Sequence, residues 1–134
     1  MLQEIHQSWH FPQPPEKVWE YLTKAELLET WLGKTDFLPV QNHAFQISSP
    51  TGNNATGEVL EIKPKKLLSY SWQKNSALDN KPFRSIVTWT LLPKDDGMEL
   101  NLEHSGFVAK EDVESHTSGW NECLKLMSDL LGEG

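Results

Sequence analysis

The chain has 134 residues, 37% of them hydrophobic, with six tryptophans and a formal net charge of −7. This length and this apolar content suit one folded domain, so we predict a single domain over residues 1–134 rather than two domains or a disordered chain. The negative charge argues against nucleic acid as a partner, and the absence of any apolar run of about 18 residues argues against membrane insertion.

The first predicted element is a strand. Apolar and polar residues alternate over residues 5–11, which is typical of a strand with one buried face, and Pro12 ends the pattern. A short helix is predicted next, because prolines are tolerated at a first helical turn and the apolar residues that follow have helical spacing: Val18, Trp19 and Leu22.

A second short helix is predicted directly after the first. Thr23 and Glu26 have the spacing of a capping box, so we expect this helix to begin at Thr23. Gly33 is expected to end it. The residues that it would bury are Leu27, Leu28 and Trp31.

From Asp36 to Phe107 the hydrophobic period changes to two, which indicates antiparallel strands. The predicted strands are 37–40, 44–48, 56–62, 67–74, 84–92 and 99–107. Turns are expected at 50–53, at 63–66 and at Asp96-Gly97, a dipeptide typical of tight hairpins. A longer polar loop is expected at 75–82.

The last predicted element is a long amphipathic helix over residues 111–131. Its apolar stripe recurs every three or four residues: Trp120, Leu124, Met127 and Leu131. The opposite face is polar and should contact water: Glu114, Ser118, Glu122, Lys125 and Asp129. Gly132 is expected to end the helix.

This element order predicts an α+β fold. A curved antiparallel sheet of about seven strands would wrap onto the long C-terminal helix, with two short helices after the first strand. No signal-peptide pattern precedes residue 5, and the single Cys123 cannot form an internal disulfide, so we expect a cytoplasmic protein.

Several motifs resemble the START-like (SRPBCC) superfamily, and most closely its branch related to the C-terminal domain of the activator of Hsp90 ATPase. They are Gly57-Glu58-Val59-Leu60-Glu61-Ile62, Ser85-Ile86-Val87-Thr88-Trp89, His104-Ser105-Gly106-Phe107 and Gly119-Trp120. The resemblance implies the helix-grip fold, also called Bet v 1-like, in which the sheet and the C-terminal helix enclose a hydrophobic cavity. It also implies a small apolar molecule or a chaperone as a partner.

We therefore expect a ligand cavity between the terminal helix and the sheet. Large side chains predicted to face this space are typical of small-molecule sites, although the same residues could form a filled core. The predicted lining residues are Trp9, Phe45, Tyr70, Trp72, Trp89, Leu102, His104, His116, Trp120, Leu124 and Met127.

His104 and His116 are the polar members of this set. Either could bind a ligand or transfer a proton near neutral pH, or could simply satisfy a buried polar group. No motif for metal binding, nucleophilic catalysis or phosphate binding occurs, so we predict no metal, no cofactor and no catalytic residue.

The predicted function is the binding of a small hydrophobic ligand of the lipid, polyketide or aromatic class. Two alternatives stay open. One is a stress or chaperone-accessory interaction module related to activators of Hsp90 ATPase, and the other is a cyclase-type enzyme with His104 as its general base.

Overall fold

A computed structural model describes residues 3–48 and 54–133. The described chain forms one antiparallel sheet of seven strands, in the order β1-β7-β6-β5-β4-β3-β2. The strands are β1 (Gln3–Phe11), β2 (Lys34–Thr35), β3 (Ala44–Ser48), β4 (Asn54–Lys63), β5 (Leu67–Asn75), β6 (Pro82–Lys94) and β7 (Gly97–Phe107). The helices are α1 (Pro15–Thr23), α2 (Ala25–Trp31) and α3 (Lys110–Glu133). The predicted α+β helix-grip architecture is therefore confirmed.

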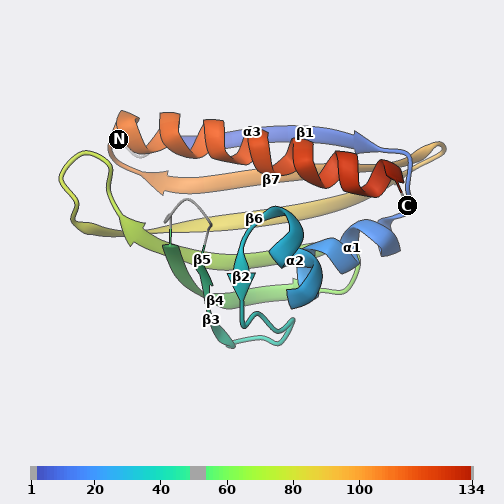
Figure 1. The fold of residues 1–134 in the computed structure, drawn as a ribbon, viewed down its shortest axis with the longest axis horizontal. Helices are drawn as coiled ribbons and strands as arrows, with labels where there is room; N and C mark the ends of the chain where they lie inside the picture. Colours follow the sequence, from blue (N-terminus) through green and yellow to red (C-terminus); the bar gives the residue numbers. More distant parts are fainter. Residues whose placement is uncertain (1–2, 49–53, 134) are drawn as a thin grey trace.

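The helices cover one face of the sheet. Figure 1 shows α3 running along β1 and β7, while α1 and α2 lie over the other half and carry the chain from the first edge strand to β2 at the opposite edge. Within the described residues, no helix combines the length and the hydropathy needed to cross a membrane.

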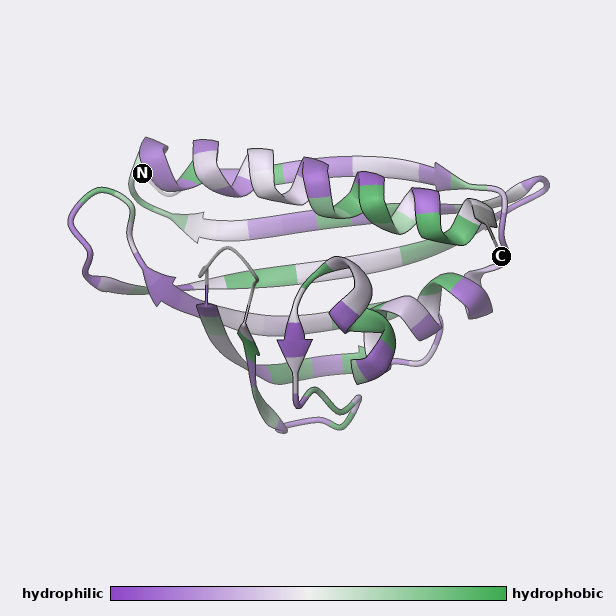
Figure 2. Cartoon of the chain, in the orientation of Figure 1, coloured by the Kyte–Doolittle hydropathy of each residue, from purple (hydrophilic) through white to green (hydrophobic). Residues whose placement is uncertain are grey.

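The apolar stripe of α3 faces the sheet as predicted. Trp120, Leu124, Met127 and Leu131 are buried, and Figure 2 shows hydrophobic segments concentrated in the second half of this helix. The five residues predicted to face water are all exposed: Glu114, Ser118, Glu122, Lys125 and Asp129. Gly132 does not end the helix, which continues to Glu133.

The sheet bends strongly at β4. Its pairing with β5 shifts register between Val59 and Glu61, and a Cβ atom at Gly57 would lie 2.0 Å from the carbonyl oxygen of Ser71. Only glycine allows the two backbones to approach this closely. The bend brings Phe45 of β3 over the inner face, where its ring contacts Tyr70 at a centroid distance of 5.2 Å.

The predicted strand at 37–40 is wrong. β2 pairs with β3 only at Lys34 and Thr35. The carboxylate of Asp36 then accepts from the backbone N–H of Gln46 at 2.9 Å, in place of a further strand-to-strand bond, and the chain leaves the sheet. Pro39 has no N–H to offer a ladder.

The predicted capping box is also wrong. The Thr23 hydroxyl donates to the carbonyl of Trp19 at 2.8 Å, inside α1, so it is not available to cap α2. Lys24, in extended conformation, is the N-cap residue of α2. The turn predicted at 50–53 lies outside the described residues.

Candidate functional site

The buried face between α3 and the sheet contains a polar cluster, which we define as His104, Ser85, Trp120, Trp72 and His116. His104 comes from β7, Ser85 from β6, Trp72 from β5, and the other two from α3. Side chains along a strand point alternately to the two faces of the sheet. In the register of this sheet, Trp72 pairs with Ser85, and Val87 pairs with His104. Residues that are far apart in sequence therefore meet beneath one helix.

Both ring nitrogens of His104 are hydrogen-bonded. Trp120 Nε1 donates to His104 Nδ1 at 2.9 Å, and His104 Nε2 lies 2.7 Å from the Ser85 hydroxyl. An indole N–H can only donate, so Nδ1 must carry the lone pair and Nε2 the proton. Ser85 therefore accepts from His104 Nε2–H, and its own hydroxyl donates to the carbonyl oxygen of Trp72, 3.1 Å away.

His104 is held neutral. It is completely buried, and burial, followed by the nearby His116 and Lys74, lowers its pKa to about 2. Its basic nitrogen is already occupied by Trp120. In this arrangement His104 lacks a free lone pair for a general base, so the structure gives no support to the cyclase alternative.

His116 differs because one of its nitrogens has no partner. Its Nδ1–H donates to the carbonyl oxygen of Asp112 at 2.8 Å, so Nε2 carries a lone pair. That atom is buried and makes no hydrogen bond within the described part of the chain. Burial is the largest cause of a lowered pKa for His116. Its imidazole therefore presents an unused acceptor to the interior.

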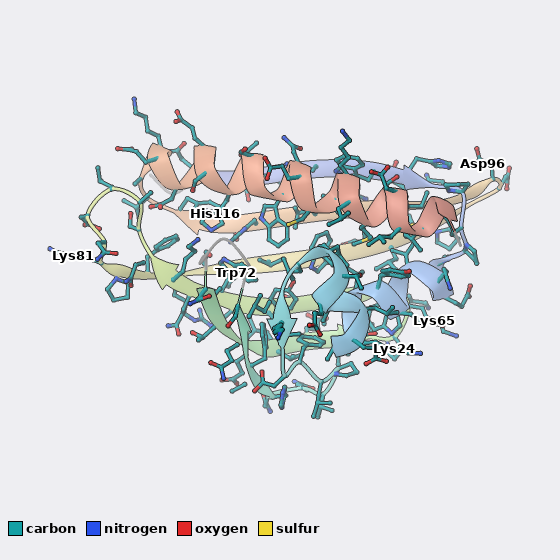
Figure 3. All side chains as sticks on the ribbon, viewed as in Figure 1. Lys24, Lys65, Trp72, Lys81, Asp96 and His116 are labelled. Atoms are coloured by element: carbon teal, nitrogen blue, oxygen red, sulfur yellow. The ribbon has the colours of Figure 1, made fainter. Side chains whose placement is uncertain are left out.

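Trp72 presents the complementary group. Its Nε1–H is buried and makes no hydrogen bond among the described residues, and the residue as a whole is only 7% exposed. Both Trp72 and His116 contact the ring of His104, at centroid distances of 6.1 and 5.2 Å. In Figure 3 both lie nearer to Lys81 than to Asp96.

Aromatic rings enclose the polar cluster. Trp120 contacts Trp72 at 5.6 Å and Trp89 at 5.4 Å between centroids. Trp89 in turn donates to the hydroxyl of Tyr70, whose pKa is raised by burial. Four further predicted lining residues are buried in the same core: Phe45, Leu102, Leu124 and Met127.

Trp9 lies apart from this cluster. It is half-buried in an open groove of about 490 Å³ between β1 and α3, beside Val113, Thr117 and Asn121. A second groove of about 520 Å³ is lined mainly by polar residues of β3, β4 and β5. Neither groove is lined by a member of the polar cluster.

Several residues at the edge of the site were not predicted from the sequence. Lys74 is two residues after Trp72 on β5, and burial lowers its pKa while the Asp112 carboxylate opposes that change. Asp112 is itself buried and accepts from the Ser76 hydroxyl at 2.5 Å and the Ala77 N–H at 2.7 Å. These bonds tie the loop after β5 to the start of α3. Strand alternation could have identified Lys74 and Ser85, since both are in phase with inward residues.

One group of side chains outside the core has the composition of a metal site. Glu4, His6 and Glu103 place their ligand atoms within 4.8 Å of one another, and His6 is paired with Glu103 across β1 and β7. All three are exposed, and exposed acidic groups commonly gather without a metal. We assign them no metal.

A family model matches residues 12–132, and its description is activator of Hsp90 ATPase homolog 1-like protein. The chain belongs to this family. This AHSA1-like chain also matches protein MLL2253 from Mesorhizobium loti, with 34% identity over 98% of each chain and a TM-score of 0.90. No curated protein matches it.

Two further structural neighbours of the AHSA1-like chain are larger. CalU16 from Micromonospora echinospora is 25% identical, with a TM-score of 0.73 over 97% of this chain and 75% of that one. DynU16, a protein in the dynemicin biosynthetic locus, is 19% identical, with a TM-score of 0.83 over 96% of this chain. The AHSA1-like chain spans about half of the length of DynU16, since it covers 47% of it.

Proposed function

We propose that this protein binds a small apolar or aromatic molecule between α3 and the sheet, beside His104 and Trp120. The observation that carries the proposal is a pair of buried polar atoms, Trp72 Nε1 and His116 Nε2, that have no hydrogen-bond partner in residues 3–48 and 54–133. A buried polar group left without a hydrogen bond costs about 1–3 kcal/mol. A bound molecule with polar groups would remove that cost for both atoms.

The contrast with His104 supports this interpretation. His104 has the same surroundings, yet both of its nitrogens and the adjacent Ser85 hydroxyl are paired. The protein therefore satisfies its structural polar groups here, and His116 and Trp72 are exceptions beside a complete network.

Entry of a ligand would require the first half of α3 to move. Before Trp120 this helix is held to the core by His116 and the partly buried Val113, whereas four buried apolar side chains follow from Trp120 onward. A Cβ atom at Gly119 would meet no atom of the described residues within 4 Å. Asp112 holds the start of the helix to Ser76 and Ala77. Opening at these contacts would uncover the cluster while the second half of α3 stays packed.

DynU16, which shares this fold, is a protein in the dynemicin biosynthetic locus, and this supports a small molecule as the ligand. The lipid, polyketide and aromatic classes expected from the sequence are the compounds to test first.

Ligand titrations of variants that each lack one tryptophan would test the proposal. Compounds of the three classes are screened by thermal shift, because a ligand that binds only the folded protein raises its Tm. Any hit is then titrated against Trp72→Phe and Trp9→Phe by fluorescence. An interior ligand that accepts from Trp72 Nε1–H should bind more weakly to Trp72→Phe and with unchanged affinity to Trp9→Phe. Binding that depends on Trp9 would place the ligand in the outer groove, and the absence of any hit would contradict the proposal.

The family description supports a second candidate, an accessory role toward a chaperone ATPase. That role would use the outer surface, where a formal net charge of −7 makes binding to a basic partner fall as salt rises. Measuring the ATPase rate of Hsp90 with and without the protein, at low and high salt, separates this candidate from ligand binding. We also propose a cytoplasmic location, which cell fractionation would test.

A further inference from the structure

The two unpartnered atoms of the site are opposite in kind. Trp72 Nε1–H can only donate a hydrogen bond. His116 Nε2 can only accept one while the imidazole is neutral, because its proton is on Nδ1 and faces the Asp112 carbonyl. A molecule that satisfies both must therefore supply one acceptor and one donor.

The surroundings of these atoms are aromatic. The His116 ring contacts Phe107 at 5.0 Å and Phe83 at 6.2 Å between centroids, and Trp72 contacts Trp120 at 5.6 Å. Edge-to-face and tilted ring contacts of this kind favour another planar ring over a flexible chain. The ligand expected here has a ring and few polar atoms.

We propose that the ligand is a hydroxylated aromatic molecule whose hydroxyl group donates to His116 Nε2 and offers its oxygen to Trp72 Nε1–H. The inference rests on the proposed function and names the chemical class that this site takes. A phenolic hydroxyl combines the two required roles in one group. A carboxylate only accepts and would leave His116 unpaired, whereas an ammonium only donates and would leave Trp72 unpaired.

Lys74 supports an oxygen-bearing ligand over a cationic one. Its side chain is half-buried on the same strand as Trp72 and forms no ion pair with a carboxylate in residues 3–48 or 54–133. A positive charge here favours the partial negative charge of a hydroxyl oxygen and opposes a bound cation.

The experiment compares probes of one size that differ in one group: 2-naphthol, 2-methoxynaphthalene, naphthalene and 2-naphthoate. Each is titrated into the wild-type protein at neutral pH. We expect 2-naphthol to bind about tenfold tighter than 2-methoxynaphthalene, because the ether can accept from Trp72 but cannot donate to His116.

Variants then assign the two roles. His116→Phe should reduce the preference for 2-naphthol over the ether to about onefold, while His116→Gln, whose amide oxygen can accept, should keep most of it. Trp72→Phe should weaken 2-naphthol and the ether together relative to naphthalene. Trp9→Phe is the matched control and should change none of these ratios. Near-ultraviolet circular dichroism checks that each variant is folded.

The outcomes separate this inference from the function on which it rests. Equal binding of naphthalene and 2-naphthol would overturn the hydroxyl inference and leave a purely apolar binding site. Tightest binding of 2-naphthoate, lost in Lys74→Met, would overturn it in favour of an acidic ligand. If none of the four probes binds, the hydroxyl inference and aromatic ligand binding both fail.

Discussion

The proton of His104 is on Nε2 because Nδ1 accepts a hydrogen bond from the indole N–H of Trp120. That assignment extends outward, since it obliges Ser85 to accept from the ring and to donate to the Trp72 carbonyl. A single side chain on α3 therefore orients two side-chain groups and a backbone carbonyl on three strands. Polar networks of this kind are stabilising only when every member has a partner.

Replacing Ser85 should test this dependence. Ser85→Ala leaves the Nε2–H of a completely buried His104 without an acceptor, so we expect the free energy of unfolding to fall by about 1–3 kcal/mol. Ser8→Ala is the matched control, because that hydroxyl is exposed on β1, and a change within about 0.5 kcal/mol is expected. Urea denaturation measures both. Equal midpoints for the two variants would refute the network.

The two halves of α3 are held in different ways. The second half is anchored by buried apolar side chains from Trp120 to Leu131. Apolar packing does not depend on the direction of individual bonds. The first half has one partly buried apolar side chain, Val113, and depends mainly on Asp112, whose two carboxylate oxygens accept from Ser76 and Ala77, and on His116. Directional contacts of this type can be broken together by one substitution, so the first half of the helix is the part suited to move.

Removing the Asp112 carboxylate should release the loop between β5 and β6. In Asp112→Ala both acceptors are lost, and hydrogen bonds to a charged group each contribute about 1.5–3 kcal/mol. We expect faster amide hydrogen exchange at Ala77 and faster chymotrypsin cleavage after the exposed Leu78.

Asp129→Ala is the control on the solvent side of the same helix. It should leave exchange at Ala77 and cleavage after Leu78 unchanged. If Asp112→Ala also leaves both rates unchanged, the carboxylate does not hold the loop closed.

At the level of the whole molecule, three tryptophans connect both groups of helices to the sheet. Trp31 of α2 contacts Trp89 of β6 at 6.2 Å, and Trp89 contacts Trp120 of α3 at 5.4 Å. The helices at opposite halves of the sheet therefore share one core, and the buried histidines lie inside it. Protonation of these histidines then acts on the stability of the entire fold.

Stability should consequently fall as the pH falls below 6.5. The folded pKa of His104 is lowered to about 2 and that of His116 is also lowered, so below pH 6.5 the unfolded chain binds protons that the folded chain does not. The stability slope with pH is then positive, and His104 alone should cost about 2 kcal/mol between pH 7 and pH 5.

Urea titrations at the two pH values measure this difference. His104→Gln, whose amide can still donate to Ser85 and accept from Trp120, should remove most of the His104 contribution. His6→Gln, at an exposed position of β1, is the control and should retain it. An identical pH dependence in wild type and His104→Gln would show that the pKa of His104 is not lowered in the folded state.

Local spacing within the sequence was sufficient for most of the architecture. Alternation on β5, β6 and β7 and the stripe on α3 identified their buried faces, because side-chain direction repeats with a period set by the backbone. The failures occurred where a side chain found a partner outside its own segment. Asp36 bonded to Gln46 and ended β2 early, and Thr23 bonded within α1 and left α2 without its predicted cap.

The tertiary structure alone decided which polar atoms of the candidate site are paired. The sequence placed His104 and His116 on inward faces and assigned them the same roles. The fold pairs both ring nitrogens of His104, whereas Nε2 of His116 has no partner in the described part of the chain. The physical reason is that strand register, sheet curvature and the position of α3 determine these distances jointly. A hydrogen bond changes from made to lost within about 1 Å, which no residue spacing along the chain can specify.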